Sequence, residues 1–206
     1  NQCPFLIIGQ RWNVKVDAPW DFSNPEWEEQ LRDYAKIYGK LDRVTGIDYF
    51  VFPKGLFGEI PPFVLGRCWH DAWLIYRAKK LKVPVIDATS QNMIIHQRHD
   101  FFYTAFNKKG ILNMKSPEVA NNQKLCRDRS RFYTVLDASH VLSYDGLKKP
   151  CLGRRVRRFS TWLTRYTWYV ISEVCHPYSL PIVIAIRSLK SGVSKLKELT
   201  ENKNLR

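Results

Sequence analysis

The sequence predicts an α/β domain followed by a basic helical appendage, and three patterns support this prediction. Short apolar runs at 5–9, 46–53 and 83–86 have the length and composition of buried strands. Between them lie segments with apolar residues three and four positions apart, which is typical of helices that pack on a sheet. Strands that alternate with helices form a layered α/β domain. Because the composition turns basic and aromatic later in the chain, we expect two regions, 1–145 and 146–206.

Capping and turn residues set the expected ends of the helices. Ser23 and Glu26 have the spacing of a capping box, so the first helix should begin there and end before Gly39. Apolar spacing predicts a second helix at about 68–81, and Ser116 followed by proline predicts the start of a third. The other expected elements are a loop at 54–62 and short strands at 93–95 and 132–136.

Cysteine content and hydropathy exclude several classes of protein. The five cysteines are odd in number, widely spaced and free of Cys-x-x-Cys pairs, which argues against a disulfide framework and a thiolate zinc site. We therefore expect a reducing, cytoplasmic compartment. No apolar run approaches the roughly 18 residues of a membrane-spanning helix. Asn1 leads into the first apolar run without a signal-peptide pattern, so we expect the chain to be incomplete at its N-terminus.

Positive charge is concentrated in the C-terminal region. The chain carries 33 basic and 19 acidic residues, a net charge of +14, and residues 146–206 supply 13 of the basic and three of the acidic ones. A polyanionic partner should therefore meet this region.

Arginines and aromatic residues alternate at the start of this region. The residues concerned are Arg154, Arg155, Arg157, Arg158, Phe159, Trp162, Tyr166 and Trp168. They would suit an anionic membrane surface, with the rings at the level of the headgroups, or the phosphates and bases of a nucleic acid. They would equally suit a solvated basic helix that packs its aromatic residues on the domain. We favour the membrane over nucleic acid.

Four side chains are candidates for chemistry. Asp71 lies in the first turn of the second expected helix, where a carboxylate either interacts with the helix dipole or acts as a base. His96 and His99 follow an expected strand, a place where α/β sheets bind ligands, and they are either metal ligands or solvated side chains. Asp48 lies within an apolar strand, where it either faces a cleft or bonds to local backbone donors.

Five segments together resemble the C-terminal part of GT-A-fold, family 2-like glycosyltransferases that use nucleotide-diphosphate sugars. They are FLIIGQRW at 5–12, GIDYFVFPKG at 46–55, GRCWHDAWLIYRA at 66–78, VIDAT at 85–89 and IHQRHD at 95–100. The resemblance covers about residues 5–145 and is most specific in the third and fifth segments. It implies a GT-A-like mixed sheet with flanking helices.

The resemblance also implies an activity and a set of site residues. The expected reaction transfers a sugar from a nucleotide-diphosphate sugar to an acceptor hydroxyl, with the help of a divalent metal, Mn or Mg. Asp71 matches the general base, and His96 or His99 would complete the metal shell. The residues expected to bind substrate are Asp48, Arg67, Trp69 and His70, with Arg67 placed to stabilise the leaving diphosphate.

The resemblance departs from the family pattern at one motif. The family's Asp-x-Asp metal motif normally precedes the strand that matches 5–9. The chain is therefore expected to be either a fragment of a longer enzyme or a relative that does not bind the donor, and these 206 residues are not expected to catalyse transfer alone.

Two other classes of function remain as alternatives. The pairs His70-Asp71 and His99-Asp100 are the kind found in HD-type metal phosphohydrolases, but that chemistry requires an all-helical scaffold, and the Val/Ile/Phe runs predict strands. A non-catalytic binding module, in which residues 146–206 contact an anionic membrane or a nucleic acid, is the second alternative.

Overall fold

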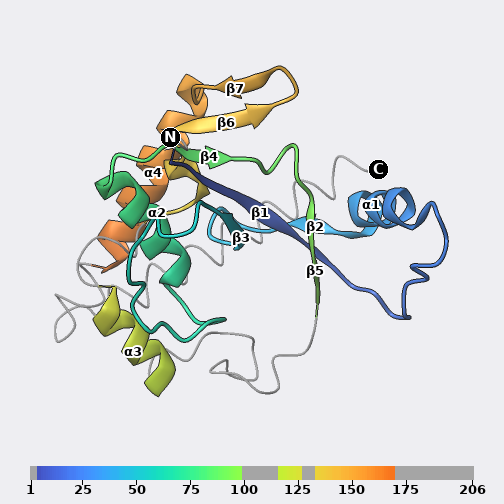
Figure 1. Cartoon of the computed structure of the whole chain (residues 1–206), viewed down its shortest axis with the longest axis horizontal. Helices are drawn as coiled ribbons and strands as arrows, with labels where there is room; N and C mark the ends of the chain where they lie inside the picture. Colours follow the sequence, from blue (N-terminus) through green and yellow to red (C-terminus); the bar gives the residue numbers. More distant parts are fainter. Residues whose placement is uncertain (1–3, 99–115, 127–132, 170–206) are drawn as a thin grey trace, which may run out of the picture. The chain divides into compact units, whose positions relative to one another are not determined.

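The fold is α/β, as predicted, with a mixed sheet and flanking helices (Figure 1). The computed structural model describes residues 4–98, 116–126 and 133–169. The chain divides into two compact units between Arg158 and Phe159, and the sheet belongs to the first of them. Within the described ranges, none of the helices combines the length and the apolar character needed to cross a bilayer.

The central strand of the sheet is β1 (Leu6–Val14), which pairs with four other strands. Its first half lies between β3 (Ile47–Val51), which is antiparallel, and β4 (Val85–Asp87), which is parallel. Its second half lies between β2 (Lys40–Leu41), antiparallel, and β5 (Ile94–Gln97), parallel. Because β1 is bonded on both edges along its length, its neighbours are fixed in register by its backbone.

The far edge of the sheet is a short hairpin. β6 (His140–Ser143) pairs in parallel with β4, and β7 (Gly146–Lys148) pairs antiparallel with β6 (Figure 1). Gly146 has a φ of 102°, a backbone conformation that favours glycine and allows the tight turn. The sheet thus continues beyond position 145, and its compact unit extends to Arg158.

The helices begin and end at residues with clear local causes. They are α1 (Trp27–Tyr38), α2 (His70–Lys80), α3 (Pro117–Leu125), the 3-10 helix η2 (Val135–Asp137) and α4 (Leu152–Tyr169). The Ser116 side chain accepts a hydrogen bond from the Val119 N–H at the start of α3, as its sequence predicted. Gly39 follows α1, and its N–H bonds to the Ala35 carbonyl. The expected helices at 68–81 and from Ser116 are therefore confirmed.

Two local predictions were wrong, for identifiable reasons. Ser23 does not cap α1, because its hydroxyl donates to Asp21 at 2.6 Å, and no side chain caps the helix at Glu26. The expected strand at 132–136 is replaced by η2 where the chain is described. There Thr134 and Asp137 form a reciprocal capping box, which bends the backbone into a 3-10 turn.

The core lies between the sheet and α2. Leu6, Ile8 and Val85 of the strands are fully buried, and Ile75 and Ala78 of α2 meet them in one cluster. Burying a side chain of Leu or Ile size contributes roughly 1.5–3 kcal/mol. The spacing of the buried positions in α2 gives the helix one apolar face, which sets its rotation, and with it the position of its first turn.

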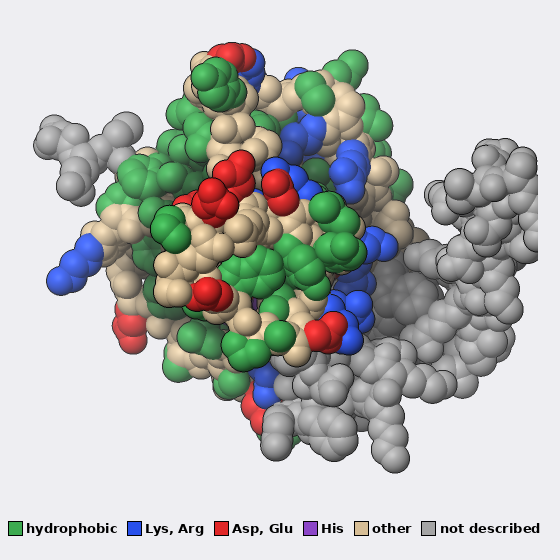
Figure 2. Space-filling model, turned by 90° about the vertical axis from the view of Figure 1, so that its right-hand side faces the viewer, with side chains coloured by type: hydrophobic (Ala, Val, Ile, Leu, Met, Phe, Trp, Pro, Cys, Tyr) green, Lys and Arg blue, Asp and Glu red, His purple; other side chains and the backbone are tan. Residues whose placement is uncertain are grey.

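α1 is less deeply packed than α2. Ala35 is its one fully buried residue, whereas Ile37 and Tyr38 are largely exposed, as is Phe22 ahead of the helix. Figure 2 views the molecule from the side on which α1 lies in Figure 1, and hydrophobic, acidic and basic side chains share this face.

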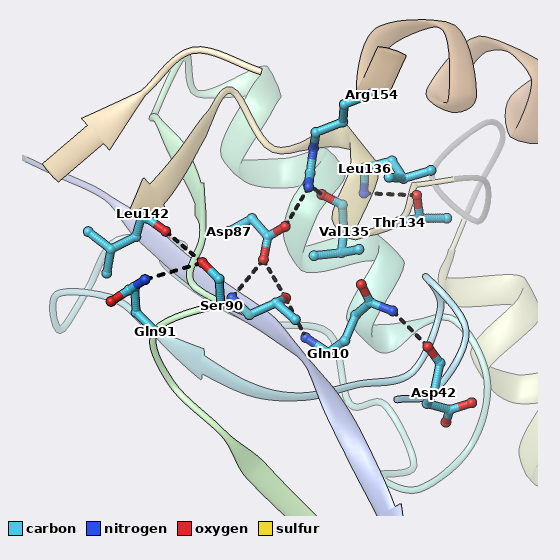
Figure 3. Close-up of polar contacts among 11 residues, drawn as sticks. Gln10, Asp42, Asp87, Ser90, Gln91, Thr134, Val135, Leu136, Leu142 and Arg154 are labelled. Carbon is cyan, nitrogen blue, oxygen red and sulfur yellow. Dashed lines mark hydrogen bonds and ion pairs between the residues drawn. The ribbon is translucent and has the colours of Figure 1, made fainter. Parts of the chain in front are cut away.

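The start of α4 is anchored to the sheet by arginines. Arg154 pairs with Asp87 at 2.7 Å and donates to the Val135 carbonyl, also at 2.7 Å (Figure 3). Asp87 ends β4 and also accepts hydrogen bonds from the N–H and hydroxyl of Thr89. One turn later, Arg158 pairs with Asp137 of η2 at 2.7 Å. Two of the four clustered arginines therefore hold the first turns of the helix to the sheet and η2.

The Asp87–Arg154 pair is expected to be essential for stability, because the two side chains are only 4% and 18% exposed. Arg154→Met leaves a buried carboxylate without its counter-ion, so we expect the free energy of unfolding to fall by about 3 kcal/mol. Arg155→Met is the matched control, since Arg155 is exposed, and should change it by less than about 0.5 kcal/mol. Urea denaturation measures both, and equal effects of the two variants would contradict the prediction.

Candidate functional site

One part of the candidate site is the start of α2. Trp69, which precedes the helix, has a φ of 82°, a left-handed conformation that is rare for a large side chain. His70 Nδ1 lies 3.2 Å from the Arg67 carbonyl, and the Asp71 carboxylate accepts the Ala72 N–H at 2.9 Å. Strain of this kind persists where the surrounding structure holds the chain in place.

A buried asparagine holds the loop before α2. Asn122 of α3 is fully buried, and its side chain accepts the Val64 N–H at 2.8 Å and donates to the carbonyls of Val64 and Cys68 at 2.9 and 3.1 Å. The Cys126 thiol, also buried, donates to the Trp69 carbonyl at 3.2 Å. α3 therefore positions the residues that enter α2.

The second part is a cluster of charged side chains on three strands and the loop after β2. Asp48 of β3 accepts from Arg11 Nη1 at 2.9 Å and lies 3.0 Å from His96 Nδ1. Arg11 of β1 also donates through Nε to Asp42 at 2.8 Å. All four side chains are between 16% and 28% exposed, so solvent and small ligands can reach them. Asp48 is thus satisfied by side chains from other strands and not by local backbone donors.

The charges in this cluster do not balance. Asp42 and Asp48 carry two negative charges against one on Arg11, which leaves a net charge of −1 when His96 is neutral. Burial of Asp42 opposes ionisation, but hydrogen bonds from the Arg43 N–H, Asn13 and Arg11 outweigh it and lower the pKa of Asp42. The cluster therefore has the electrostatic character that attracts a cation.

β3 connects the two parts of the site. Opposite β1, Ile47 pairs with Gln10 and Tyr49 with Gly9, so Asp48 is the extra residue of a β-bulge and the alternation of side chains does not continue across it. Asp48 meets His96, and the Phe50 ring lies 6.2 Å from the His70 ring at the start of α2. β3 thus contacts both parts of the site, His96 through Asp48 and His70 through Phe50.

One of the two expected metal ligands, His96, lies in the described part of the chain. A histidine that donates Nδ1–H to a carboxylate presents Nε2 as its metal-binding atom, which is the arrangement that Asp48 and His96 adopt. In the described ranges, no group of three or more His, Cys, Asp or Glu side chains has a metal-binding arrangement. His99 and Asp100 lie outside those ranges, so the second expected imidazole is not placed.

Two members of the charged cluster were missed from the sequence. Arg11 lies in a segment used for the family resemblance, but nothing local showed that its guanidinium bridges Asp42 and Asp48. Asp42 follows β2, a two-residue strand with no sequence signal of its own. Arg67 was predicted to bind the diphosphate; it is half-buried in the loop before α2, and its Nη1 donates to the Gly66 carbonyl.

Comparison with known proteins adds no assignment: no protein-family model, no curated protein and no solved structure matches the chain. The resemblance to glycosyltransferases therefore stays a prediction that rests on the sequence segments. The geometry of the start of α2 and of the Asp48–His96 pair is the structural basis on which a function can be proposed.

The loop before α2 is expected to depend on Asn122. Asn122→Ala removes three hydrogen bonds and leaves the Val64 N–H without its partner, so we expect a loss of about 2 kcal/mol in the free energy of unfolding. Asn121→Ala is the control, because Asn121 makes one long contact of 3.5 Å to the Pro62 carbonyl. Thermal or urea unfolding distinguishes them, and a stable Asn122→Ala variant would refute the anchoring role.

Proposed function

We propose that this chain is the C-terminal part of a metal-dependent glycosyltransferase of the GT-A kind, which transfers a sugar from a nucleotide-diphosphate sugar to an acceptor hydroxyl. The observation that carries the proposal is that β3 contacts both candidate groups: Asp48 lies 3.0 Å from His96 Nδ1, and the Phe50 ring lies 6.2 Å from that of His70, which precedes Asp71 in α2. The mixed sheet is compatible with this fold.

Asp71 is proposed as the general base. The acceptor hydroxyl must lose its proton as its oxygen attacks the sugar, and a half-buried carboxylate in reach of solvent suits that role. The Ala72 N–H donates to one carboxylate oxygen and thereby fixes the orientation of the side chain. The helix-start role and the catalytic role are compatible, because the hydrogen bond from the Ala72 N–H within the first turn also orients the carboxylate.

His96, with His99, is proposed to hold a divalent cation, Mn or Mg, which would neutralise the charge of the departing diphosphate. Imidazole ligands suit Mn better than Mg. Asp48 orients the His96 ring, and Arg11 keeps Asp48 in place from the neighbouring strand. Arg67, on the loop before α2, would add positive charge for the same leaving group.

The two alternatives differ in their structural support. An HD-type phosphohydrolase is disfavoured, because its ligands require an all-helical scaffold and the structure has a mixed sheet at the site. A binding role for the basic C-terminal region is compatible with the transferase, since the arginines concerned lie on α4 and the proposed catalytic residues do not.

The role of Asp71 is tested by Asp71→Asn in the full-length protein. Transfer, measured as release of nucleoside diphosphate from a panel of nucleotide sugars with acceptor and Mn²⁺, should fall by about 10²- to 10⁴-fold. Asparagine also accepts at a helix start, so the unfolding free energy should change by less than about 1 kcal/mol. Glu29→Gln, a first-turn carboxylate of α1, is the control and should keep full activity. Unchanged turnover in Asp71→Asn would remove this residue from the mechanism.

The metal site is tested without reference to activity. We expect Mn²⁺ binding, followed by electron paramagnetic resonance, to weaken by at least about tenfold in His96→Gln. His140→Gln is the matched control, because His140 is a half-buried histidine of β6 that contacts Ser139 and should leave binding unchanged. If wild type and both variants bind Mn²⁺ equally, or none binds it, His96 is not a ligand.

A further inference from the structure

α4 carries an exposed apolar stripe along its length. Its members are separated by four and three residues in alternation, and each is at least 36% exposed: Leu152, Val156, Phe159, Leu163 and Tyr166. At 3.6 residues per turn this spacing places all five on one side of the helix. Exposed apolar side chains scattered singly are ordinary, but a continuous stripe of this kind marks an interaction surface.

The anchoring arginines lie on the other side of the same helix. Arg154 and Arg158 are one turn apart, and they are offset from Val156 by two residues, which corresponds to about 160° around the helix axis. Both are held by carboxylates of the α/β unit, Asp87 and Asp137. Near Arg158, Lys79 Nζ donates to the backbone carbonyl of Asp137 at 3.0 Å. Burial lowers the pKa of Lys79. The polar side of α4 therefore pairs with carboxylates of the α/β unit at these two positions.

The charge of α4 narrows the class of partner. The helix has five arginines and no acidic residue. Arg155 is exposed and lies four residues before Phe159, so it borders the stripe. A helix with a strongly apolar side, low overall hydrophobicity and arginines elsewhere on its surface is the type that lies in the plane of a lipid interface.

Aromatic rings extend the stripe on one flank. The Trp162 ring stacks on the Tyr166 ring with centroids 5.1 Å apart and an interplanar angle of 7°, and it also stacks on Phe159 at 6.4 Å. Trp and Tyr combine an apolar body with a polar tip, and both are enriched at membrane interfaces. Trp162, beside the stripe, would lie at headgroup level when the stripe contacts the acyl chains.

We propose that α4 docks this chain on an anionic lipid surface, with the stripe inserted in the interface and Arg155 against the headgroups. A nucleic acid fits less well, because two of the five arginines are engaged by carboxylates and the exposed side presents Leu, Val and Phe. A helix of a second copy also fits less well. The stripe spans about two heptads, fewer than a stable coiled coil needs, and paired arginines would repel.

Co-sedimentation of the whole chain with vesicles tests the proposal. The wild type should bind phosphatidylcholine vesicles that contain phosphatidylserine more tightly than phosphatidylcholine alone, and less tightly as salt is raised. Phe159→Ser with Leu163→Ser should lower the partition coefficient at least about tenfold. Arg155→Gln should lower it about fivefold. Thr164→Ala, on the polar side of α4, should leave it unchanged, and circular dichroism checks that each variant is folded.

Several results would overturn the assignment. One is a wild-type chain that does not bind phosphatidylserine vesicles at low salt. Another is a Phe159→Ser, Leu163→Ser variant that binds them as tightly as the wild type. Tight binding to a single-stranded RNA oligonucleotide without vesicle binding would assign the helix to nucleic acid. A dimer in analytical ultracentrifugation that the stripe variant converts to a monomer, again without vesicle binding, would assign it to self-association.

Discussion

The hydrogen bonds of β1 hold the two parts of the candidate site in one frame. A strand bonded on both edges leaves its backbone no freedom to slip, because a shift of one residue would turn every side chain to the other face. β1 brings Arg11 between β3 and β5, where its guanidinium reaches Asp48. The same strand contributes Leu6 and Ile8 to the core under α2. Core packing and site geometry therefore depend on one register.

Electrostatics give the charged cluster its chemical character. Arg11 bridges Asp42 and Asp48, and Asp48 orients the His96 ring, so each group restrains the next. Surface ion pairs contribute little to stability, but these side chains are only partly exposed and form a network, in which geometry is better defined. A net negative charge beside an oriented imidazole is consistent with the divalent cation of the proposed transferase.

The two sides of α4 differ in their contacts. Arg154 and Arg158 form ion pairs with buried carboxylates at the end of β4 and in η2, whereas the apolar residues of α4 are exposed along the helix. This is the reverse of the usual amphipathic helix, which buries its apolar side on its own domain. The exposed apolar residues of α4 and the proposed catalytic residues are different side chains, so lipid docking and sugar transfer would not compete for the same residues.

The sequence by itself determined the α/β class, the strands at β3, β4 and β5, and the helices α2 and α3, because periodicity and caps such as Ser116 act over a few residues. It also placed Asp71 at a helix start. Only the tertiary structure decided the partners of Asp48, since Arg11 lies 37 residues away and His96 lies on a strand across β1. Likewise, no local pattern showed that Arg154 forms an ion pair with Asp87. Such pairs form through sheet register and helix docking, and long-range contacts of this kind leave no periodic trace in the sequence.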